Sequence, residues 1–124
     1  MEAAIKLARQ YFLELKPPQP HRTRFISRKQ SYHGNTLGAL SVSGHQYRRE
    51  KFEPLLMKIS SSVSPCFEFR GKNASESTAA YVERLAKELD DEFKRQGPGN
   101  VCAFIAETVV GAVGIPLLST SPPF

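Results

Sequence analysis

A tyrosine, a histidine and a glycine stand next to one another at Tyr32, His33 and Gly34, in the stretch SYHGN. Together they offer an aromatic face, an imidazole that titrates near neutral pH and a backbone without a side chain. A second chemically active position, Glu107, closes the apolar run VCAFIAE. A carboxylate at the end of a buried strand has to be paired or solvated, so it is also a candidate for a functional site.

Each of these residues also has a plain structural explanation. Tyr32 can be an ordinary half-buried aromatic, and His33 can bond a nearby carbonyl. Glu107 can pair with an arginine that only supports the fold, and Gly34 can serve a turn. Residue type and spacing alone leave both kinds of role open.

Helical periodicity predicts two longer helices. In residues 2–15 the apolar side chains recur at helical spacing, and a proline-rich segment ends the pattern. The first helix starts without a capping residue, which is typical of a truncated chain. Residues 75–96 form the clearest helix, with Ser75 or Ser77 as its cap and Gly97 just after its end.

Short apolar runs predict strands between and after these helices. Residues 22–28 predict one strand, and the unbroken apolar run 101–107 predicts another, buried on both faces within a parallel sheet. Segment 36–43 is compatible with a helix or with an irregular crossover. We expect residues 59–65 to form a loop and residues 66–71 a short extended piece.

The order of helices and strands predicts an α/β fold, in which helical layers cover a mostly parallel sheet. In such sheets, ligands bind beyond the carboxyl ends of the strands. The loop with Tyr32, His33 and Gly34 follows one predicted strand, and Glu107 follows the other. If both strands belong to one parallel sheet, the two groups share one edge, and that edge is the predicted site.

The composition is typical of a globular domain or of part of one, with 124 residues, 40% hydrophobic and 23% charged. The net charge of +5 suits anionic partners, and segments 21–29 and 45–51 interleave cations with aromatic rings. Because no nucleic-acid-binding motif accompanies them, nucleic-acid binding is an alternative and not the main hypothesis.

Several classes of protein are disfavoured by the sequence. Cys66 and Cys102 indicate neither a disulfide scaffold nor a zinc site, and they fit a reducing compartment. No apolar run is long enough to span a bilayer, and no secretory leader is present. We therefore expect a cytoplasmic protein, with mitochondria as the other compartment. Hydrolase motifs, a P-loop and a dinucleotide-binding fingerprint are absent.

Three segments in series resemble the class-III aminotransferases, enzymes of fold type I that use pyridoxal phosphate. They are EAAIKLARQYF, RFISRKQSYHGNTLGALSVSG and AFIAETVVGAVG, and the resemblance covers roughly residues 2–114. It implies that residues 1–124 are part of the large, cofactor-binding domain, a partial three-layer fold with an atypical tail at about 115–124. It also implies a homodimeric complete enzyme that moves an amino group between an amine or amino acid and a keto acid.

The resemblance also implies roles for single residues. Tyr32 matches the aromatic residue that stacks on the pyridine ring of the cofactor, and His33 and Gly34 complete the family's Tyr-His-Gly turn. Glu107 matches the strand-end glutamate on the substrate side of the site, which often pairs with an arginine from far downstream.

The chain also departs from the family pattern. No lysine here matches the Schiff-base lysine, whose place in the family lies beyond Phe124, so we expect no catalytic residue and no activity from the isolated chain. The family's phosphate-binding turn would precede Met1, and Thr108 stands where the family usually has proline. We interpret the chain as a fragment of such an enzyme, and a non-catalytic association fragment is the other alternative.

Overall fold

A sheet of three parallel strands organises the chain. The computed structural model describes residues 1–112, so the predicted atypical tail lies outside the described residues. Strand β1 (Arg24–Arg28) lies in the middle, between β2 (Ser60–Val63) and β3 (Val101–Ile105). Both neighbours run parallel to β1, whose three central residues are buried. The expected parallel sheet is confirmed.

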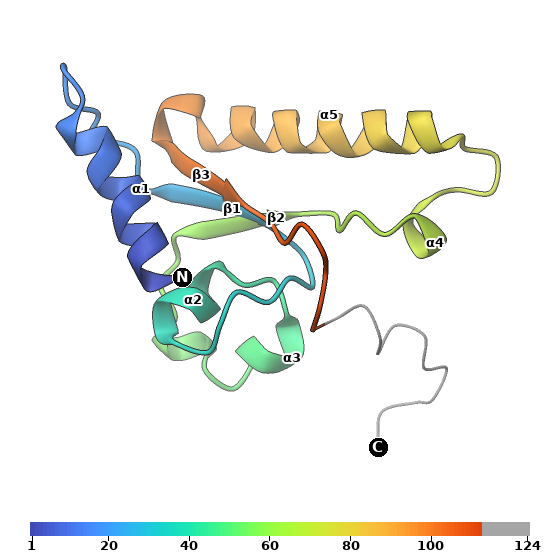
Figure 1. Cartoon of the computed structure of the whole chain (residues 1–124), viewed down its shortest axis with the longest axis horizontal. Helices are drawn as coiled ribbons and strands as arrows, with labels where there is room; N and C mark the ends of the chain where they lie inside the picture. Colours follow the sequence, from blue (N-terminus) through green and yellow to red (C-terminus); the bar gives the residue numbers. More distant parts are fainter. Residues whose placement is uncertain (113–124) are drawn as a thin grey trace.

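Helices cover both faces of this sheet (Figure 1). The long helix α5 (Thr78–Gln96) lies on one face, and α1 (Glu2–Glu14) and α2 (Leu37–Val42) lie on the other. The predicted α/β fold with helical layers is therefore confirmed. None of the described helices is long and apolar enough to cross a membrane.

Neighbouring residues of β1 point into two separate cores, because side chains alternate along a strand. Phe25 belongs to the core on the side of α1 and α2, together with Ile5 and Val42. Ile26 is fully buried in the core on the side of α5, against which Leu89 of that helix packs. The central strand thus joins the two helical layers.

Helix α5 begins and ends close to where the sequence predicts. The Ser77 hydroxyl accepts a hydrogen bond from the N–H of Ala80 at 3.1 Å, so Ser77 and not Ser75 is the cap. Gly97 follows the last helical residue with a φ of +80°. Helix α1 begins without a side-chain capping bond, as expected.

The segment between β1 and β2 contains only short helical pieces. Residues 36–43, which the sequence leaves open, contain the helix α2. Helix α3 (Gln46–Arg49) is a single turn, and Pro54 lies in the 3₁₀ turn η1 (Glu53–Leu55). A second 3₁₀ turn, η2 (Pro98–Asn100), leads from α5 into β3.

Three sequence predictions are wrong. Residues 59–65 do not form a loop, because they contain β2, a strand of three serines and a valine whose conformation is set by its pairing with β1. Residues 66–71 are not extended, since Glu68–Gly71 forms the one-turn helix α4. Strand β3 is not buried on both faces: it lies at an edge of the described sheet, and only its first residue, Val101, is buried.

The hydroxyl of Tyr81 joins α5 to the segment before α4, and we expect it to contribute to stability. This buried oxygen accepts a hydrogen bond from the N–H of Phe67 at 2.9 Å and donates one to the carbonyl of Pro65 at 3.3 Å. Tyr81→Phe leaves the Phe67 N–H without its partner, so the free energy of unfolding should fall by about 1–3 kcal/mol. Tyr11→Phe, at a ring that is 59% exposed, should change it by less than about 0.5 kcal/mol. Urea unfolding measures both variants, and equal effects would contradict the role of the Tyr81 hydroxyl.

Candidate functional site

Two loops leave the carboxyl ends of β1 and β3 and meet at one edge of the sheet. The first carries Tyr32, His33 and Gly34, and the second carries Glu107. The backbone N–H of Tyr32 donates a hydrogen bond to Glu107 Oε1 at 3.0 Å, although the two residues are 75 positions apart. Parallel pairing therefore brings the two predicted groups together, while what they bind stays a prediction.

Both carboxylate oxygens of Glu107 accept hydrogen bonds from backbone N–H groups. Besides the bond from Tyr32, Oε2 accepts one from the N–H of Gly111 at 3.2 Å. Among the ion pairs of residues 1–112, none involves Glu107. The half-buried carboxylate is thus satisfied by the backbone of two loops and not by a structural arginine from the described residues.

A buried serine holds the Tyr-His-Gly turn against α2. The backbone N–H of His33 donates to Ser43 Oγ at 2.9 Å, and this hydroxyl donates to the carbonyl of Ala39 at 2.8 Å. Ser43 is only 2% exposed and directly follows the last residue of α2. Sequence reasoning missed Ser43, because nothing in the small-residue segment 36–43 indicates which hydroxyl turns inward.

Two glycines make the geometry of the turn possible. Gly34 has a φ of +129°, a backbone conformation that residues with a side chain rarely adopt. A Cβ atom on Gly44 would collide with the carbonyl oxygen of Arg28 at the end of β1. The N–H of Gly44 donates to the carbonyl of Ser31 at 3.0 Å, and its own carbonyl accepts from the N–H of Gln30 at 2.9 Å. Gly44, which sequence reasoning also missed, therefore keeps the turn close to the end of the strand.

The imidazole of His33 is only partly satisfied. Its Nε2 atom is buried and has no hydrogen-bond partner among the described residues. Burial lowers the pKa of His33 below its ordinary value of 6.5, while the negative charge of Glu107 acts in the opposite direction. A pKa below 6.5 favours the neutral form of the ring at pH 7, and the buried Nε2 is a polar atom without a partner in residues 1–112.

The ring of Tyr32 is half-buried and belongs to neither hydrophobic core. The guanidinium carbon of Arg48 lies 4.6 Å from the ring centroid, a distance typical of a cation–π contact. The ring is therefore partly exposed, with the guanidinium group of Arg48 near it.

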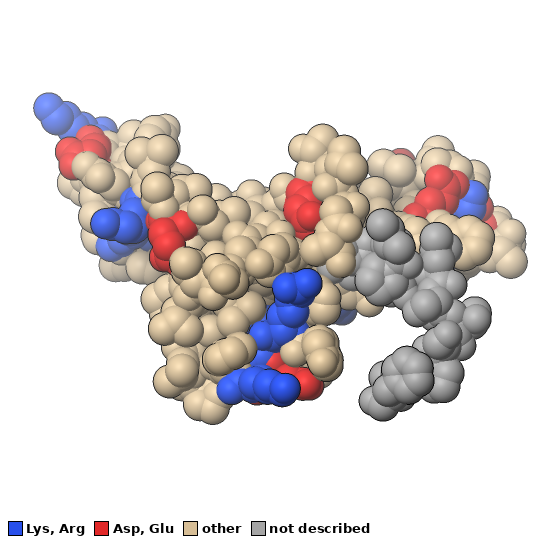
Figure 2. Space-filling view, turned by 60° about the horizontal axis from the view of Figure 1, so that its bottom comes forward, with Lys and Arg blue, Asp and Glu red and all other residues tan. Residues whose placement is uncertain are grey.

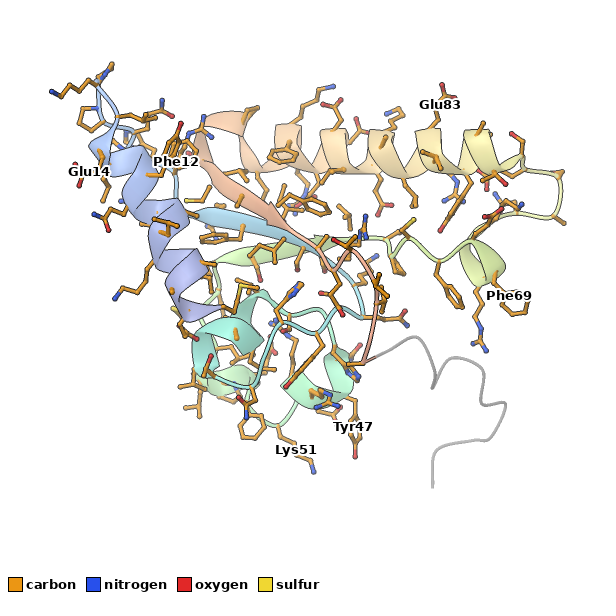
Figure 3. All side chains as sticks on the ribbon, in the orientation of Figure 1. Phe12, Glu14, Tyr47, Lys51, Phe69 and Glu83 are labelled. Atoms are coloured by element: carbon orange, nitrogen blue, oxygen red, sulfur yellow. The ribbon has the colours of Figure 1, made fainter. Side chains whose placement is uncertain are left out.

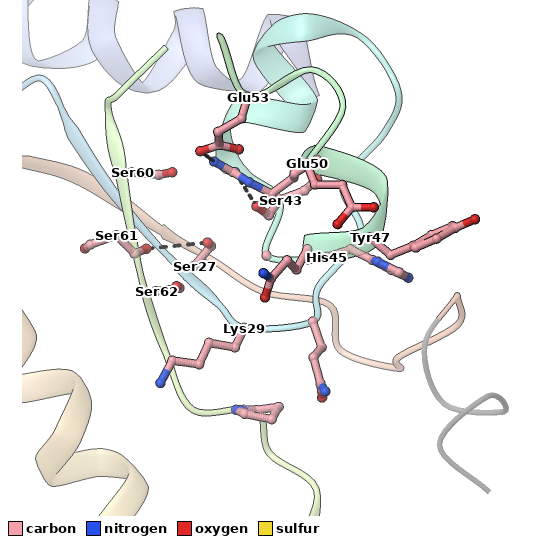
Figure 4. A pocket seen from close by; sticks show the side chains of 15 residues that line it. Ser27, Lys29, Ser43, His45, Tyr47, Glu50, Glu53, Ser60, Ser61 and Ser62 are labelled. Atoms are coloured by element: carbon pink, nitrogen blue, oxygen red, sulfur yellow. Dashed lines mark hydrogen bonds and ion pairs between the residues drawn. The ribbon is translucent and has the colours of Figure 1, made fainter. Parts of the chain in front are cut away.

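A pocket of about 980 Å³ lies beside this edge but does not contain the predicted site residues. Figure 4 shows Ser60, Ser61 and Ser62 of β2 in its wall, opposite the segment that carries α3. Its lining includes Ser43 and Gly44 next to the turn, and Lys29 and Gln30 directly after β1. In the described part of the chain, no group of three or more His, Cys, Asp and Glu side chains could hold a metal ion. We therefore place the candidate site at the strand ends and not in this pocket.

Arginines of the basic segments 21–29 and 45–51 donate hydrogen bonds to backbone carbonyls within the fold. Arg22 donates to the carbonyl of Val101 at 2.6 Å, and Arg49 donates to three carbonyls at the end of α2 at 2.6 to 3.0 Å. On the face in Figure 2, Lys and Arg side chains lie in separate groups, some of them next to Asp or Glu. Tyr47 and Lys51 point outward in Figure 3. The charges on this face therefore do not form a continuous basic surface of the kind that binds nucleic acid.

Comparisons with known proteins agree with the resemblance noted from the sequence. The chain matches the model of the family "Aminotransferase class-III" over residues 1–121. An aminotransferase from Gibberella zeae is 54% identical over 113 residues, and an uncharacterized aminotransferase from Schizosaccharomyces pombe is 51% identical over 112 residues. Each alignment covers 90% of this chain but only 22% and 24%, respectively, of the relative.

A solved structure has the same backbone arrangement. The omega transaminase from Pseudomonas jessenii in complex with PMP matches with a TM-score of 0.82 and 30% identity, over 92% of this chain and 24% of that chain. The chain thus spans about a quarter of the length of the proteins that it matches. Since the family model covers nearly the whole sequence and the fold agrees with a solved transaminase, this chain belongs to the class-III aminotransferases.

Proposed function

We propose that the complete protein is a pyridoxal-phosphate-dependent transaminase and that this chain forms part of its cofactor site. Such an enzyme moves an amino group between an amine or amino acid and a keto acid. The main support is the meeting of residues 32–34 with Glu107 at the carboxyl edge of parallel strands, through a hydrogen bond of 3.0 Å. Further support is that PMP, which the Pseudomonas jessenii structure contains, is a form of the same cofactor.

Two features of this edge fit a flat cofactor with polar groups on its rim. The ring of Tyr32 lies outside both cores, and the buried Nε2 of His33 lacks a hydrogen-bond partner among residues 1–112. When bound, the pyridine ring of pyridoxal phosphate supplies the chemistry by withdrawing electrons from the substrate carbon that carries the amino group.

The residues of this chain would bind and orient the cofactor. Tyr32 offers a flat face for stacking, and the neutral imidazole of His33 offers a hydrogen-bonding nitrogen that is shielded from water. Gly34 allows the backbone to approach closely. Glu107 lies at the same edge, on the side that we assign to the substrate. The catalytic lysine is expected in another part of the complete protein.

The assembly and location of the complete enzyme are also proposals. We propose a homodimer, as the family resemblance implies, in the cytoplasm or in mitochondria. The amino donor and the keto acid acceptor are its expected small-molecule partners. Arg22 and Arg49 bind backbone carbonyls of this chain, which favours small-molecule partners over nucleic acid.

Replacing the ring of Tyr32 tests the cofactor site directly. In the complete enzyme, Tyr32→Ala removes the stacking face, so the dissociation constant of pyridoxal phosphate should rise by about tenfold. Tyr32→Phe keeps the ring and should change this constant little. A titration followed by the absorbance of the cofactor measures both variants.

The melting temperature with and without cofactor provides the control for Tyr32. If Tyr32→Ala lowers the melting temperature equally in both conditions and leaves the dissociation constant unchanged, the ring is only a packing residue. The proposed function would then lose its main site residue.

The pKa of His33 gives a second, independent test of the turn. Because burial lowers this pKa, the neutral ring contributes stability that is fully present above the ordinary value of 6.5 and is lost as the pH falls through the lower folded pKa. His33→Gln should therefore flatten the pH dependence of the unfolding free energy in this range. Glu107→Gln removes the charge that raises the pKa of His33 and should lower it further. An NMR titration of the imidazole C–H signals measures the pKa, and a value of 6.5 or above would contradict the burial of the ring.

A further inference from the structure

The side chain of Glu107 joins the two loops of the site through their backbones. Oε1 accepts the N–H of Tyr32 at 3.0 Å, and Oε2 accepts the N–H of Gly111 at 3.2 Å, four residues further along its own loop. The bond to Gly111 closes residues 107–111 around the carboxylate. The bond to Tyr32 anchors the turn after β1 to the same carboxylate. Glu107 is therefore a link between two loops that no strand pairing connects.

We propose that Glu107 is a positioning residue that holds Tyr32 in place for the cofactor and acts on binding through that residue. The inference rests on the proposed function, because it assigns to Glu107 the support of the stacking ring. It differs from a role in contacting the substrate, since both oxygens already bind backbone N–H groups of this chain.

The bond from Glu107 reaches the backbone of the same residue whose ring is proposed to stack. We therefore expect a change in this bond to shift the backbone that carries the Tyr32 ring, with no intervening residue. The next residue, His33, is anchored separately, by its N–H to the buried hydroxyl of Ser43 at 2.9 Å. The turn is thus fixed at two successive residues by two different segments, the loop after β3 and the residue after α2, and Glu107 supplies the anchor for the first of them.

Only a carboxylate of this length meets the requirements of the link. Two N–H donors converge on the side chain, so both of its terminal atoms have to be acceptors. A glutamine can accept one of the two bonds, but its NH₂ group then faces the second N–H. An aspartate keeps both acceptors but is one methylene shorter, so it cannot reach both donors from the same backbone position.

The first experiment measures the link itself, in the complete protein without cofactor. Hydrogen–deuterium exchange of peptides that contain residues 32 and 111 should become severalfold faster in Glu107→Gln than in the unchanged protein. Glu83→Gln, at an exposed residue of α5, is the matched control and should leave this exchange unchanged. Exchange that is equally slow in Glu107→Gln would overturn the proposal.

The second experiment asks whether Glu107 acts through Tyr32. Glu107→Gln should raise the dissociation constant of pyridoxal phosphate by about threefold to tenfold, which corresponds to about 0.7–1.4 kcal/mol. In the background of Tyr32→Ala, the same substitution should have little further effect, because the ring that it positions is gone. An additive effect of the two substitutions would overturn the positioning role.

Kinetics separate this inference from the substrate-side role and from the proposed function. At saturating cofactor, Glu107→Gln should raise the KM for the amino donor by a smaller factor than it raises the dissociation constant of pyridoxal phosphate, and a larger factor in KM would overturn the inference. If Tyr32→Ala weakens cofactor binding and Glu107→Gln does not, the positioning role fails and the proposed function stands. If Tyr32→Ala has no effect on cofactor binding, the proposed function fails, and faster exchange in Glu107→Gln then shows a link that serves only the fold.

Discussion

The parallel pairing of β1 with β3 is the constraint on which the candidate site depends. Because both strands end at the same edge, the loops that follow them meet there, and Tyr32 comes within hydrogen-bonding distance of Glu107. An antiparallel pairing would have placed the two loops at opposite edges. The cores on both sides of β1 maintain this pairing, since Phe25 and Ile26 anchor the strand in different helical layers.

The turn after β1 depends on small residues that bring α2 close to the end of the strand. Ser43 reaches the backbone of His33 because α2 ends directly beside the turn, and Gly44 allows the chain to pass the carbonyl of Arg28. Gly34 adopts the positive φ that the turn requires. The shape of the turn is therefore set by contacts within this chain.

The arginines of this chain show why its basic composition is a poor guide to its partners. Arg22 joins the loop before β1 to the carbonyl of Val101, and Arg49 donates to three carbonyls at the end of α2. Guanidinium groups that bind several carbonyls stabilise the fold and are not available to phosphates. Arg48, in contrast, lies against the ring of Tyr32 and belongs to the surroundings of the candidate site.

The sequence by itself determined the two long helices, the parallel α/β architecture and the place of the candidate site, because helical periodicity, caps and apolar runs are local signals. Only the tertiary structure decided that a run of serines forms β2, since its extended backbone is stabilised by pairing with β1 and not by its own side chains. The supports of the turn, Ser43 and Gly44, and the use of Glu107 as a link were likewise decided by the tertiary structure. These contacts join residues up to 75 positions apart, and their distances follow from the packing of whole elements, which no local pattern encodes.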